Sequence, residues 1–185
     1  MSVLLEEIDR VWEQADCLCS EQQVEQAIDK VAQDIENDLA DKKPLLLTVM
    51  NGGLIFTAKL MSRLNFPLEC DYVHVTRYGF ELVGTDLQWK VTPQENLADR
   101  TILIVDDILD EGQTLASIMR ACRAQGAEEV RAAVLVDKKH DRKADPGFKA
   151  DYTALEVEDR FVFGYGMDYK GYLRNAMGIY AVKGV

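Results

Sequence analysis

The fold of this chain is decided by one stretch of its sequence, Thr101-Ile102-Leu103-Ile104-Val105-Asp106-Asp107-Ile108-Leu109-Asp110-Glu111-Gly112-Gln113-Thr114-Leu115. Its apolar first part is typical of a strand that is buried on both faces of a parallel sheet. Acids, a glycine and a threonine follow, and apolar residues then recur at helical spacing, so we expect a helix to begin near Gln113 or Thr114. A strand, an acidic glycine loop and a helix N-terminus together predict a place for an anionic ligand at the end of a sheet.

The two halves of this loop suit different parts of one ligand. Gly112 lets backbone N–H groups approach a phosphate closely, Thr114 adds a hydroxyl, and the helix dipole favours the negative charge. Carboxylates repel a phosphate, but they accept hydrogen bonds from sugar hydroxyls and bind hydrated Mg²⁺. A sugar phosphate that carries Mg²⁺ therefore satisfies all of these residue types. The alternative is a strand that ends in solvated acids and a glycine turn, since acids at strand ends are common.

Length and composition set the broad class. The chain has 185 residues, 48% hydrophobic and 29% charged, which suffices for one domain with a sizeable core. Its formal net charge of −11 argues against a nucleic-acid partner, because a nucleic-acid surface needs a basic footprint. No apolar run is long enough to span a membrane, and the N-terminus has no basic region before an apolar stretch. We therefore expect a cytoplasmic protein with no signal peptide and no membrane partner.

Cysteine and histidine usage predicts no metal cluster. The four cysteines fit no zinc template, and a chain of this length does not need disulfides. Cys17 and Cys19 are compatible with a redox or metal pair, but scattered reduced cysteines are commoner in a cytosolic protein. The two histidines are too few and too scattered for a cluster, so we expect His74 in a strand and His140 exposed.

Residues 101–115 resemble the phosphoribosyl-pyrophosphate (PRPP) binding motif of the type I phosphoribosyltransferases. That motif has a hydrophobic strand, two acids, two apolar residues, Asp, a small residue, Gly, any residue and Thr. The resemblance implies that Asp106 and Asp107 hold ribose hydroxyls and Mg²⁺, and that Asp110 is the general base. The PRPP-binding set it implies is Asp106, Asp107, Asp110, Glu111, Gly112, Gln113 and Thr114. Glu111 departs from the usual Ser or Thr, and we expect its N–H to bind phosphate while its side chain points away.

A second strand, glycine loop and helix precede this motif. Residues 45–50 read as a buried strand, Asn51-Gly52-Gly53 as a turn, and a following helix faces the core with Leu54, Ala58, Met61 and Leu64. Taken alone, two glycines after a strand are more often a tight turn. In the purine salvage members of the family, a loop at this place binds the pyrophosphate of PRPP and has a cis peptide before its basic residue. The resemblance implies that Asn51 and Gly52 bind pyrophosphate, although Asn51 carries no charge.

The region after the next predicted strand, residues 68–75, is long, polar and aperiodic up to about residue 93. Family members have a flexible lid here that closes over the reacting centre and excludes water. Tyr78 matches the Tyr of the Ser-Tyr pair that begins this lid, whereas Arg77 replaces the Ser. The alternative is a hairpin with residues 87–91 as its return strand, and both descriptions are compatible.

The C-terminal third holds the residues that the resemblance assigns to the purine. A strand over 130–136 leads into a charged run that is normally a solvated loop, but Lys138 matches a lysine that hydrogen-bonds the six-position oxygen of the base. An aromatic strand is core more often than a ligand platform; in the family, nearly this string forms a hood over the purine. Phe161 then stacks on the base, and the backbone of Val162 hydrogen-bonds its edge. Asp168 lies by the purine and faces Mg²⁺, and Arg174 pairs with pyrophosphate.

Together these patterns predict an α/β protein with a doubly wound, mostly parallel sheet, and helices before it over residues 3–15 and 21–40 with Ser20 as N-cap. The resemblance is closest to the bacterial hypoxanthine-guanine branch. It implies one domain, 1–185, with a core at about 21–145, a hood at about 1–15 and 146–185, and a lid at about 76–93. It further implies a homodimer or homotetramer that uses Mg²⁺ to join hypoxanthine or guanine to PRPP, giving IMP or GMP and pyrophosphate. Two alternatives are a PRPP-fold regulator that binds nucleotides or RNA, and a structural homologue of PRPP synthetase.

Overall fold

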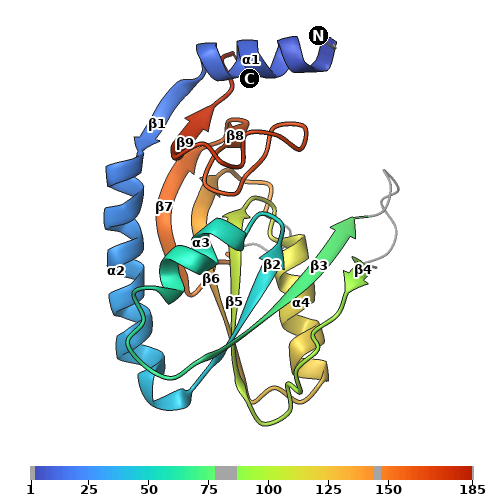
Figure 1. The fold of residues 1–185 in the computed structure, drawn as a ribbon. Helices are drawn as coiled ribbons and strands as arrows, with labels where there is room; N and C mark the ends of the chain where they lie inside the picture. Colours follow the sequence, from blue (N-terminus) through green and yellow to red (C-terminus); the bar gives the residue numbers. More distant parts are fainter. Residues whose placement is uncertain (1–2, 78–86, 144–146, 185) are drawn as a thin grey trace.

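The computed structural model describes residues 3–77, 87–143 and 147–184 (Figure 1). Helices and strands alternate along most of the chain, as the sequence predicts. Their bounds are α1 Val3–Gln14, β1 Asp16–Ser20, α2 Glu21–Leu39, the 3-10 helix η1 Ala40–Lys42, β2 Leu45–Met50, α3 Leu54–Met61, β3 Glu69–Arg77, β4 Leu87–Val91, β5 Thr101–Leu109, α4 Gln113–Ala124, β6 Glu129–Lys139, β7 Tyr152–Glu158, β8 Val162–Phe163 and β9 Gly178–Ala181.

The larger sheet has six strands in the order β4-β3-β2-β5-β6-β7. The pairs β2–β3, β2–β5, β5–β6 and β6–β7 are parallel, and only β3–β4 is antiparallel. The predicted mostly parallel sheet is therefore confirmed. The carboxyl ends of its central strands lie at one edge of the sheet, which is where ligands bind in open α/β sheets.

Strand β5 is buried on both faces, as its apolar sequence predicts. Ile102 and Ile104 pack into one cluster of the core with residues of α4, whereas Leu103 and Val105 pack into a second cluster with residues of α2 and α3. Alternate side chains of a strand point to opposite faces, so the strand supplies both layers. In Figure 1, α3 and α4 accordingly cover opposite faces of the sheet. The strand is longer than expected, because it stays paired with β6 through the two acids as far as Leu109.

The smaller sheet is antiparallel, in the order β1-β9-β8. Strand β1 holds Cys17 and Cys19 and was not predicted. Helix α1 packs on this sheet through Trp12, whose ring centroid lies 5.2 Å from that of Tyr180 and 6.2 Å from that of Phe163. The two ends of the described chain therefore meet at one end of the molecule (Figure 1).

Helix α2 follows its sequence pattern closely. Ser20 caps its N-terminus, as predicted, and the structure adds a capping box with Gln23. The predicted apolar stripe is buried in full: Val24, Ile28, Val31, Ile35 and Leu39. Neither α2 nor any other described helix is long and apolar enough to cross a membrane.

The predicted inward face of α3 is half right: Leu64, just after the helix, is buried, and Met61 packs against the same core cluster. Phe56, Thr57 and Leu60 are buried, whereas Leu54 is 51% exposed and Ala58 is exposed. The helix is apolar on nearly all sides, so its sequence does not specify a face. The preceding loop does so instead, because Gly53 lies against the strands: a Cβ there would be 2.6 Å from the Val105 carbonyl oxygen.

Strands β1 and β7 lie differently from the sequence-based outline, whereas the segment 76–93 follows one of its two compatible descriptions. The ends of the expected lid, 76–93, form the hairpin alternative, in which Val75 pairs with Trp89; Tyr78 lies outside the described residues. Strand β7 was not predicted and pairs with β6 in the larger sheet, although it falls in the range expected for the hood. Conversely, β1 lies in the smaller sheet, outside that range.

Candidate active site

Three loops follow the carboxyl ends of three neighbouring strands, β2, β5 and β6. They carry Asn51–Gly53, Asp110–Gly112 and His140–Lys143. The hood turn between β8 and β9 reaches the first of these loops, because a Cβ on Gly166 would lie 2.0 Å from the Gly52 carbonyl oxygen. The elements to which the sequence assigned PRPP and pyrophosphate are therefore neighbours in space.

The glycine loop after β2 lies directly on the acids of β5. A Cβ on Gly52 would be 1.9 Å from Oδ2 of Asp107, so only glycine lets the backbone run so close to this carboxylate. The Met50–Asn51 peptide is cis, as the resemblance leads us to expect at this position. Asn51 itself is exposed. This arrangement places the backbone of the loop beside the half-buried Asp107 carboxylate.

The two acids of β5 are held in a site shielded from water. Asp106 is 9% exposed, and one of its carboxylate oxygens accepts the N–H of Asp107 at 2.9 Å. Burial and the charge of Asp107 raise the pKa of Asp106 well above its usual value. Burial likewise raises the pKa of Asp107, and the charge of Arg174 opposes this rise. Buried carboxylates of this kind are stabilised by an approaching cation or by hydroxyl donors.

These acids fit a Mg²⁺ ion that arrives with a phosphate. Within the described ranges, no three acidic, histidine or cysteine side chains converge closely enough to hold a metal ion. Mg²⁺ commonly takes one or two carboxylates, water and the oxygens of a bound phosphate rather than an all-protein cage. Asp106 and Asp107 meet this requirement, since they are adjacent carboxylates at the end of a strand.

Arg174 and Asp168 form one polar unit in the hood. Arg174 Nη2 lies 2.6 Å from Asp168 Oδ1, and Nη1 donates to the Gly166 carbonyl oxygen at 2.6 Å. The second carboxylate oxygen of Asp168 accepts the N–H of Gly171 at 2.6 Å. The guanidinium is thus oriented by two acceptors, near Asp107, on which its charge acts.

The loop before α4 has the geometry of an anion-binding turn. Helix α4 begins at Gln113, as predicted, and Gly112 precedes it with a left-handed φ of 84°. The phenyl ring of Phe148 lies beneath the loop, since a Cβ on Gly112 would be 2.8 Å from that ring. Both the backbone angle and the lack of space therefore call for glycine here. Glu111 and Thr114, which flank this turn, are half-buried.

Asp110 is held by two side chains from β6 and the turn after it. Lys138 Nζ lies 3.3 Å from Oδ2, and His140 Nε2 lies 2.6 Å from Oδ1. Burial alone would raise the pKa of this carboxyl, but the hydrogen bond of His140 and the charge of Lys138 outweigh burial and lower it. Asp110 is consequently an ionised carboxylate, and its side chain is 42% exposed.

The predicted exposure of His140 is wrong, because its side chain is only 3% exposed. The charged run 137–143 has no apolar periodicity, so the sequence suggested a solvated loop. In the structure β6 continues to Lys139, and the turn after it folds inward against Asp110. Sequence reasoning also missed Lys143, whose Nζ donates to the carbonyl oxygens of Leu109 at 2.9 Å and of Asp110 at 2.6 Å.

The hood presents an aromatic surface supported from behind. Phe161 is 44% exposed, and its ring meets that of Tyr169 edge-on at 5.5 Å. The Tyr169 hydroxyl donates to Glu7 of α1 at 2.7 Å, and Lys170 pairs with the same carboxylate at 2.7 Å. Val162 is buried beside Phe161 in β8. The sequence did not indicate the contact between Glu7 and Tyr169, because the two residues are far apart along the chain.

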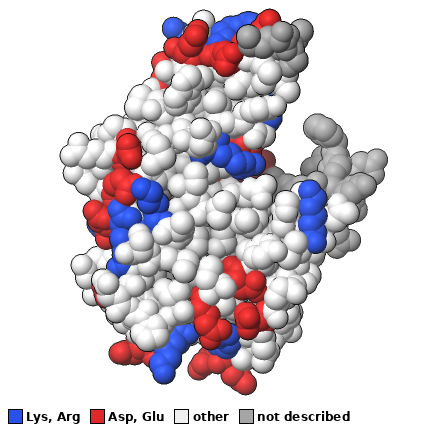
Figure 2. Space-filling view, viewed as in Figure 1, with Lys and Arg blue, Asp and Glu red and all other residues white. Residues whose placement is uncertain are grey.

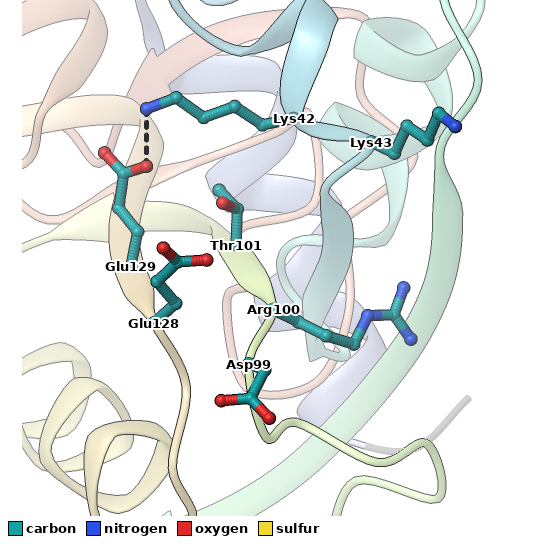
Figure 3. A pocket seen from close by; sticks show the side chains of 7 residues that line it. All are labelled: Lys42, Lys43, Asp99, Arg100, Thr101, Glu128 and Glu129. Atoms are coloured by element: carbon teal, nitrogen blue, oxygen red, sulfur yellow. Dashed lines mark hydrogen bonds and ion pairs between the residues drawn. The ribbon is translucent and has the colours of Figure 1, made fainter.

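A separate cavity of about 530 Å³ lies near the amino ends of the strands, away from these loops (Figure 3). Its lining carries three basic and three acidic side chains around one threonine, namely Lys42, Lys43, Asp99, Arg100, Thr101, Glu128 and Glu129. Its charges are partly paired, as Lys42 Nζ lies 2.6 Å from Glu129 Oε2. This mixed lining is not that of an anion site. On the face drawn in Figure 2, basic side chains are interspersed with acidic ones and form no continuous basic stripe.

A parallel sheet with a PRPP-type loop, a glycine loop and an aromatic hood defines the class of protein. The sequence pattern of the phosphoribosyl transferase domain matches residues 15–170, and the chain belongs to this family. Its relatives include the hypoxanthine-guanine phosphoribosyltransferase of Bacillus subtilis (strain 168), which is 33% identical over 159 residues, 85% of this chain and 87% of that protein. The enzyme of the same name from Streptococcus pneumoniae (strain ATCC BAA-255 / R6) is 31% identical over the same shares.

Solved structures agree with this placement. A crystal structure of a hypoxanthine phosphoribosyltransferase from Staphylococcus aureus superposes with a TM-score of 0.85 and 26% identity, covering 91% of each chain. The hypoxanthine-guanine phosphoribosyltransferase of Bacillus anthracis has a TM-score of 0.85 and 26% identity, over 90% of this chain and 98% of its own. The type I phosphoribosyltransferase fold expected from the sequence is thereby confirmed.

Proposed function

We propose that this protein transfers the 5-phosphoribosyl group of PRPP to hypoxanthine or guanine, giving IMP or GMP and pyrophosphate. The observation that supports this most directly is the contact between Lys138 and Asp110, whose Nζ and Oδ2 are 3.3 Å apart. It puts a donor for the six-position oxygen of a purine next to a carboxylate base. Its relatives of more than 30% identity carry the name of this activity.

The ribose lies between the acids of β5 and the purine hood in this proposal. Asp106 and Asp107 accept hydrogen bonds from its hydroxyl groups. As the bond to pyrophosphate breaks, positive charge develops on the sugar, and the nearby carboxylates stabilise it. Asp106 is buried and Asp107 is half-buried, which strengthens this effect, because electrostatic interactions are less screened away from water.

Asp110 removes the proton from the five-membered ring of the purine while the other ring nitrogen attacks the sugar. Positioned acid–base groups accelerate reactions by about 10²–10⁴-fold. Lys138 turns to the six-position oxygen of the base, Phe161 stacks on its face, and the backbone of Val162 binds its edge. The exposed Phe161 ring, supported by Tyr169, is suited to this stacking.

The phosphate groups bind at the two glycine loops. The backbone N–H groups of Glu111, Gly112 and Gln113 and the Thr114 hydroxyl hold the 5′-phosphate at the N-terminus of α4. Asn51, Gly52 and Arg174 hold pyrophosphate. Asp106 and Asp107 would hold one Mg²⁺, and Asp168 would contact another; these ions would supply the charge neutralisation on the pyrophosphate that Asn51 cannot provide.

The larger-scale assignments belong to the same proposal. The chain is one domain with a core, a hood built around the smaller sheet, and a lid that includes Tyr78. It works as a homodimer or homotetramer in the cytoplasm and needs neither nucleic acid nor membrane. The mixed charge of the face in Figure 2 speaks against the alternative of an RNA-binding regulator.

A radiochemical assay tests the proposal. The purified chain is incubated with PRPP, Mg²⁺ and labelled hypoxanthine, guanine or xanthine, with adenine as a control. We expect IMP or GMP to form only with PRPP present, and removal of Mg²⁺ by chelation to abolish turnover. Absence of any nucleotide product would refute the enzyme assignment. Full activity in Asp110→Asn would refute only the assignment of the base.

A further inference from the structure

The two ring nitrogens of His140 have different partners. Nε2 lies 2.6 Å from Oδ1 of Asp110, and Nδ1 accepts the backbone N–H of Arg142 at 3.0 Å. A backbone amide is always a donor, so Nδ1 must offer its lone pair and carry no proton. The proton of the neutral ring is therefore on Nε2, which donates it to Asp110.

This contact is shielded on one side and open on the other. The His140 side chain is 3% exposed, whereas that of Asp110 is 42% exposed. The imidazole is thus a fixed group beneath the carboxylate, and the hydrogen bond between them is protected from water. The second oxygen of the carboxylate, Oδ2, contacts Lys138 Nζ at 3.3 Å.

We propose that His140 is a positioning residue of the transferase reaction, fixing Asp110 by donating Nε2–H to Oδ1 so that Oδ2 receives the purine proton. This inference rests on the proposed function, in which Asp110 is the base. Asp110 thereby has two hydrogen-bond donors, which act differently in the reaction. Lys138 contacts Oδ2 and is free to turn to the six-position oxygen of the purine, whereas His140 stays in place on Oδ1.

The proton count excludes a relay through His140. The purine ring nitrogen gives its proton to Oδ2 and keeps the electron pair of that bond, while the other ring nitrogen forms the bond to the sugar. The sugar–oxygen bond breaks, and pyrophosphate leaves with its electron pair. Nε2 already holds a proton and Nδ1 already accepts the Arg142 amide. The imidazole consequently takes up no proton in the step and acts only by orienting the Asp110 carboxylate.

The charged groups around Asp110 come from three places. Lys138 is near the end of β6, Arg142 is in the turn after β6, and Asp159 directly follows β7. Lys138 Nζ lies 3.8 Å from Asp159 Oδ1 as well as 3.3 Å from Asp110. Arg142 forms two hydrogen bonds with the Asp159 carboxylate, at 2.6 and 2.9 Å, and its charge also interacts with those of Asp110 and Glu111. Asp159 therefore offsets both cations. Among the contacts that lower the pKa of Asp110, the hydrogen bond from His140 is the largest.

The same turn also fixes the main chain of the base. Lys143 Nζ donates to the carbonyl oxygens of Leu109 and Asp110, and it pairs with Asp137 Oδ1 at 2.7 Å. His140 holds the side chain of Asp110 and Lys143 holds its backbone. A base held at both points keeps its geometry when Lys138 leaves it for the substrate.

The tautomer is tested directly by nuclear magnetic resonance. The chain contains only two histidines, His74 and His140, so ¹⁵N-labelled histidine gives few signals, and His140→Gln identifies those of His140. We expect an unprotonated Nδ1 and a protonated Nε2 at neutral pH. The opposite tautomer, or a ring with both nitrogens averaged, would overturn the inference.

Steady-state kinetics test the role. In His140→Ala we expect kcat to fall by roughly ten- to a hundredfold, the range for losing a hydrogen bond to a charged group. KM values for purine and PRPP should stay within about twofold, since neither substrate touches this ring. Loss of the donor also makes Asp110 harder to ionise, so the acid limb of the pH profile of kcat/KM should move to higher pH.

A conservative variant and a neighbour separate positioning from folding. His140→Gln keeps an N–H donor and should recover most of the lost kcat and return the acid limb toward its original pH. Lys139→Ala, whose side chain is 64% exposed and pairs with Glu156, should behave as wild type. An unmoved acid limb in His140→Ala, or equal losses in His140→Gln and His140→Ala, would overturn the inference. If Asp110→Asn is fully active the proposed base has failed; if only His140→Ala is unaffected, the base stands and the positioning role falls.

Discussion

Gly52 lies against Asp107 so closely that a Cβ at this position would be 1.9 Å from Oδ2 and 2.4 Å from Cγ of the carboxylate. Gly166 of the hood closes on the same glycine from above, because its own Cβ would lie 2.0 Å from the Gly52 carbonyl oxygen. The loop after β2, the acid of β5 and the hood turn therefore meet at one backbone position. The candidate active site depends on this close approach.

Gly52→Ala is expected to impair PRPP use rather than purine binding. The added methyl group must displace either the loop or the Asp107 carboxylate, and a misplacement of about 1 Å can cost on the order of a hundredfold in rate. We expect kcat/KM for PRPP to fall by about that factor, while KM for hypoxanthine changes little. Initial-rate kinetics with each substrate varied in turn measure both values.

Gly184→Ala is a control for adding a methyl group where it meets no neighbour, although Gly52, unlike Gly184, has no positive φ. Gly184 has a positive φ of 80°, and a Cβ there would have no described neighbour within 4 Å. The control adds a backbone cost of about 1–2 kcal/mol without a clash. A similar loss of kcat/KM in both variants would show that the proximity of Gly52 to Asp107 is not the cause.

Glu7→Gln is expected to weaken purine binding through two intervening rings. Glu7 accepts hydrogen bonds from the Tyr169 hydroxyl and from Lys170, and the Tyr169 ring supports Phe161. Without the carboxylate, Tyr169 is held less firmly, so the stacking platform loses its support. We expect KM for hypoxanthine to rise about two- to tenfold, consistent with one or two weakened hydrogen bonds, with KM for PRPP unchanged.

Glu6→Gln makes the same chemical change on an exposed position of the same helix and should leave both KM values as they are. Tyr169→Phe isolates the hydrogen bond, because it keeps the ring and removes the hydroxyl. If Glu7→Gln raised KM for PRPP and not for the purine, the support of Phe161 by α1 would be disproved.

Glu25 is expected to make stability depend on acid pH. Its carboxylate accepts the Tyr165 hydroxyl, pairs with Lys59 at 2.7 Å and pairs with Arg63 at 2.5 Å, which ties the hood turn to α2 and α3. Burial alone would raise its pKa, but the hydrogen bonds from Lys59, Tyr165 and Arg63 outweigh burial and lower it to about 2 from 4.5. The unfolded chain therefore binds the proton more readily than the native state does.

It follows that the stabilisation by Glu25 is complete above pH 4.5 and is lost as pH falls toward about 2. Urea denaturation across this range measures the free energy of unfolding of the wild type and of Glu25→Gln. The variant should be less stable at neutral pH, and the difference between the two proteins should shrink as the solution is acidified. A difference that stays constant with pH would contradict this account.

The central sheet was predictable because its strands carry their own signal. Residues 45–50 and 101–105 are continuous runs of apolar or β-branched residues, and burial on both faces requires such runs. Strand β1 carries no comparable signal. It is a short segment that becomes a strand only by pairing with β9, whose Ile179 lies opposite Cys19 although the two are distant in sequence.

The candidate site likewise has a part that the sequence predicts and a part that it does not. The order of residues in 101–115 predicts the phosphate loop and the helix that follows, since both are local features. The partners of Asp110 were not predictable, because Lys138 and His140 reach it across separations of 28 and 30 residues. Charged runs such as 137–143 resemble solvated loops, and only the turn after β6 decides that His140 points inward.

Glu111→Ser is expected to change PRPP affinity by less than about threefold. The carboxylate would repel the 5′-phosphate if it pointed into the loop, and replacing it by the residue type usual in the family would then strengthen binding by orders of magnitude. The charge of Arg142, on the turn after β6, interacts with that of Glu111 as well as with that of Asp110. This interaction favours a Glu111 side chain that points toward Arg142, so that only the N–H of Glu111 binds the phosphate.

Isothermal titration calorimetry with PRPP, on wild type and on Glu111→Ser at the same Mg²⁺ concentration, gives the comparison. Glu111→Gln supplies the control for charge alone, and a tenfold or larger gain in affinity in both variants would place the carboxylate inside the phosphate site.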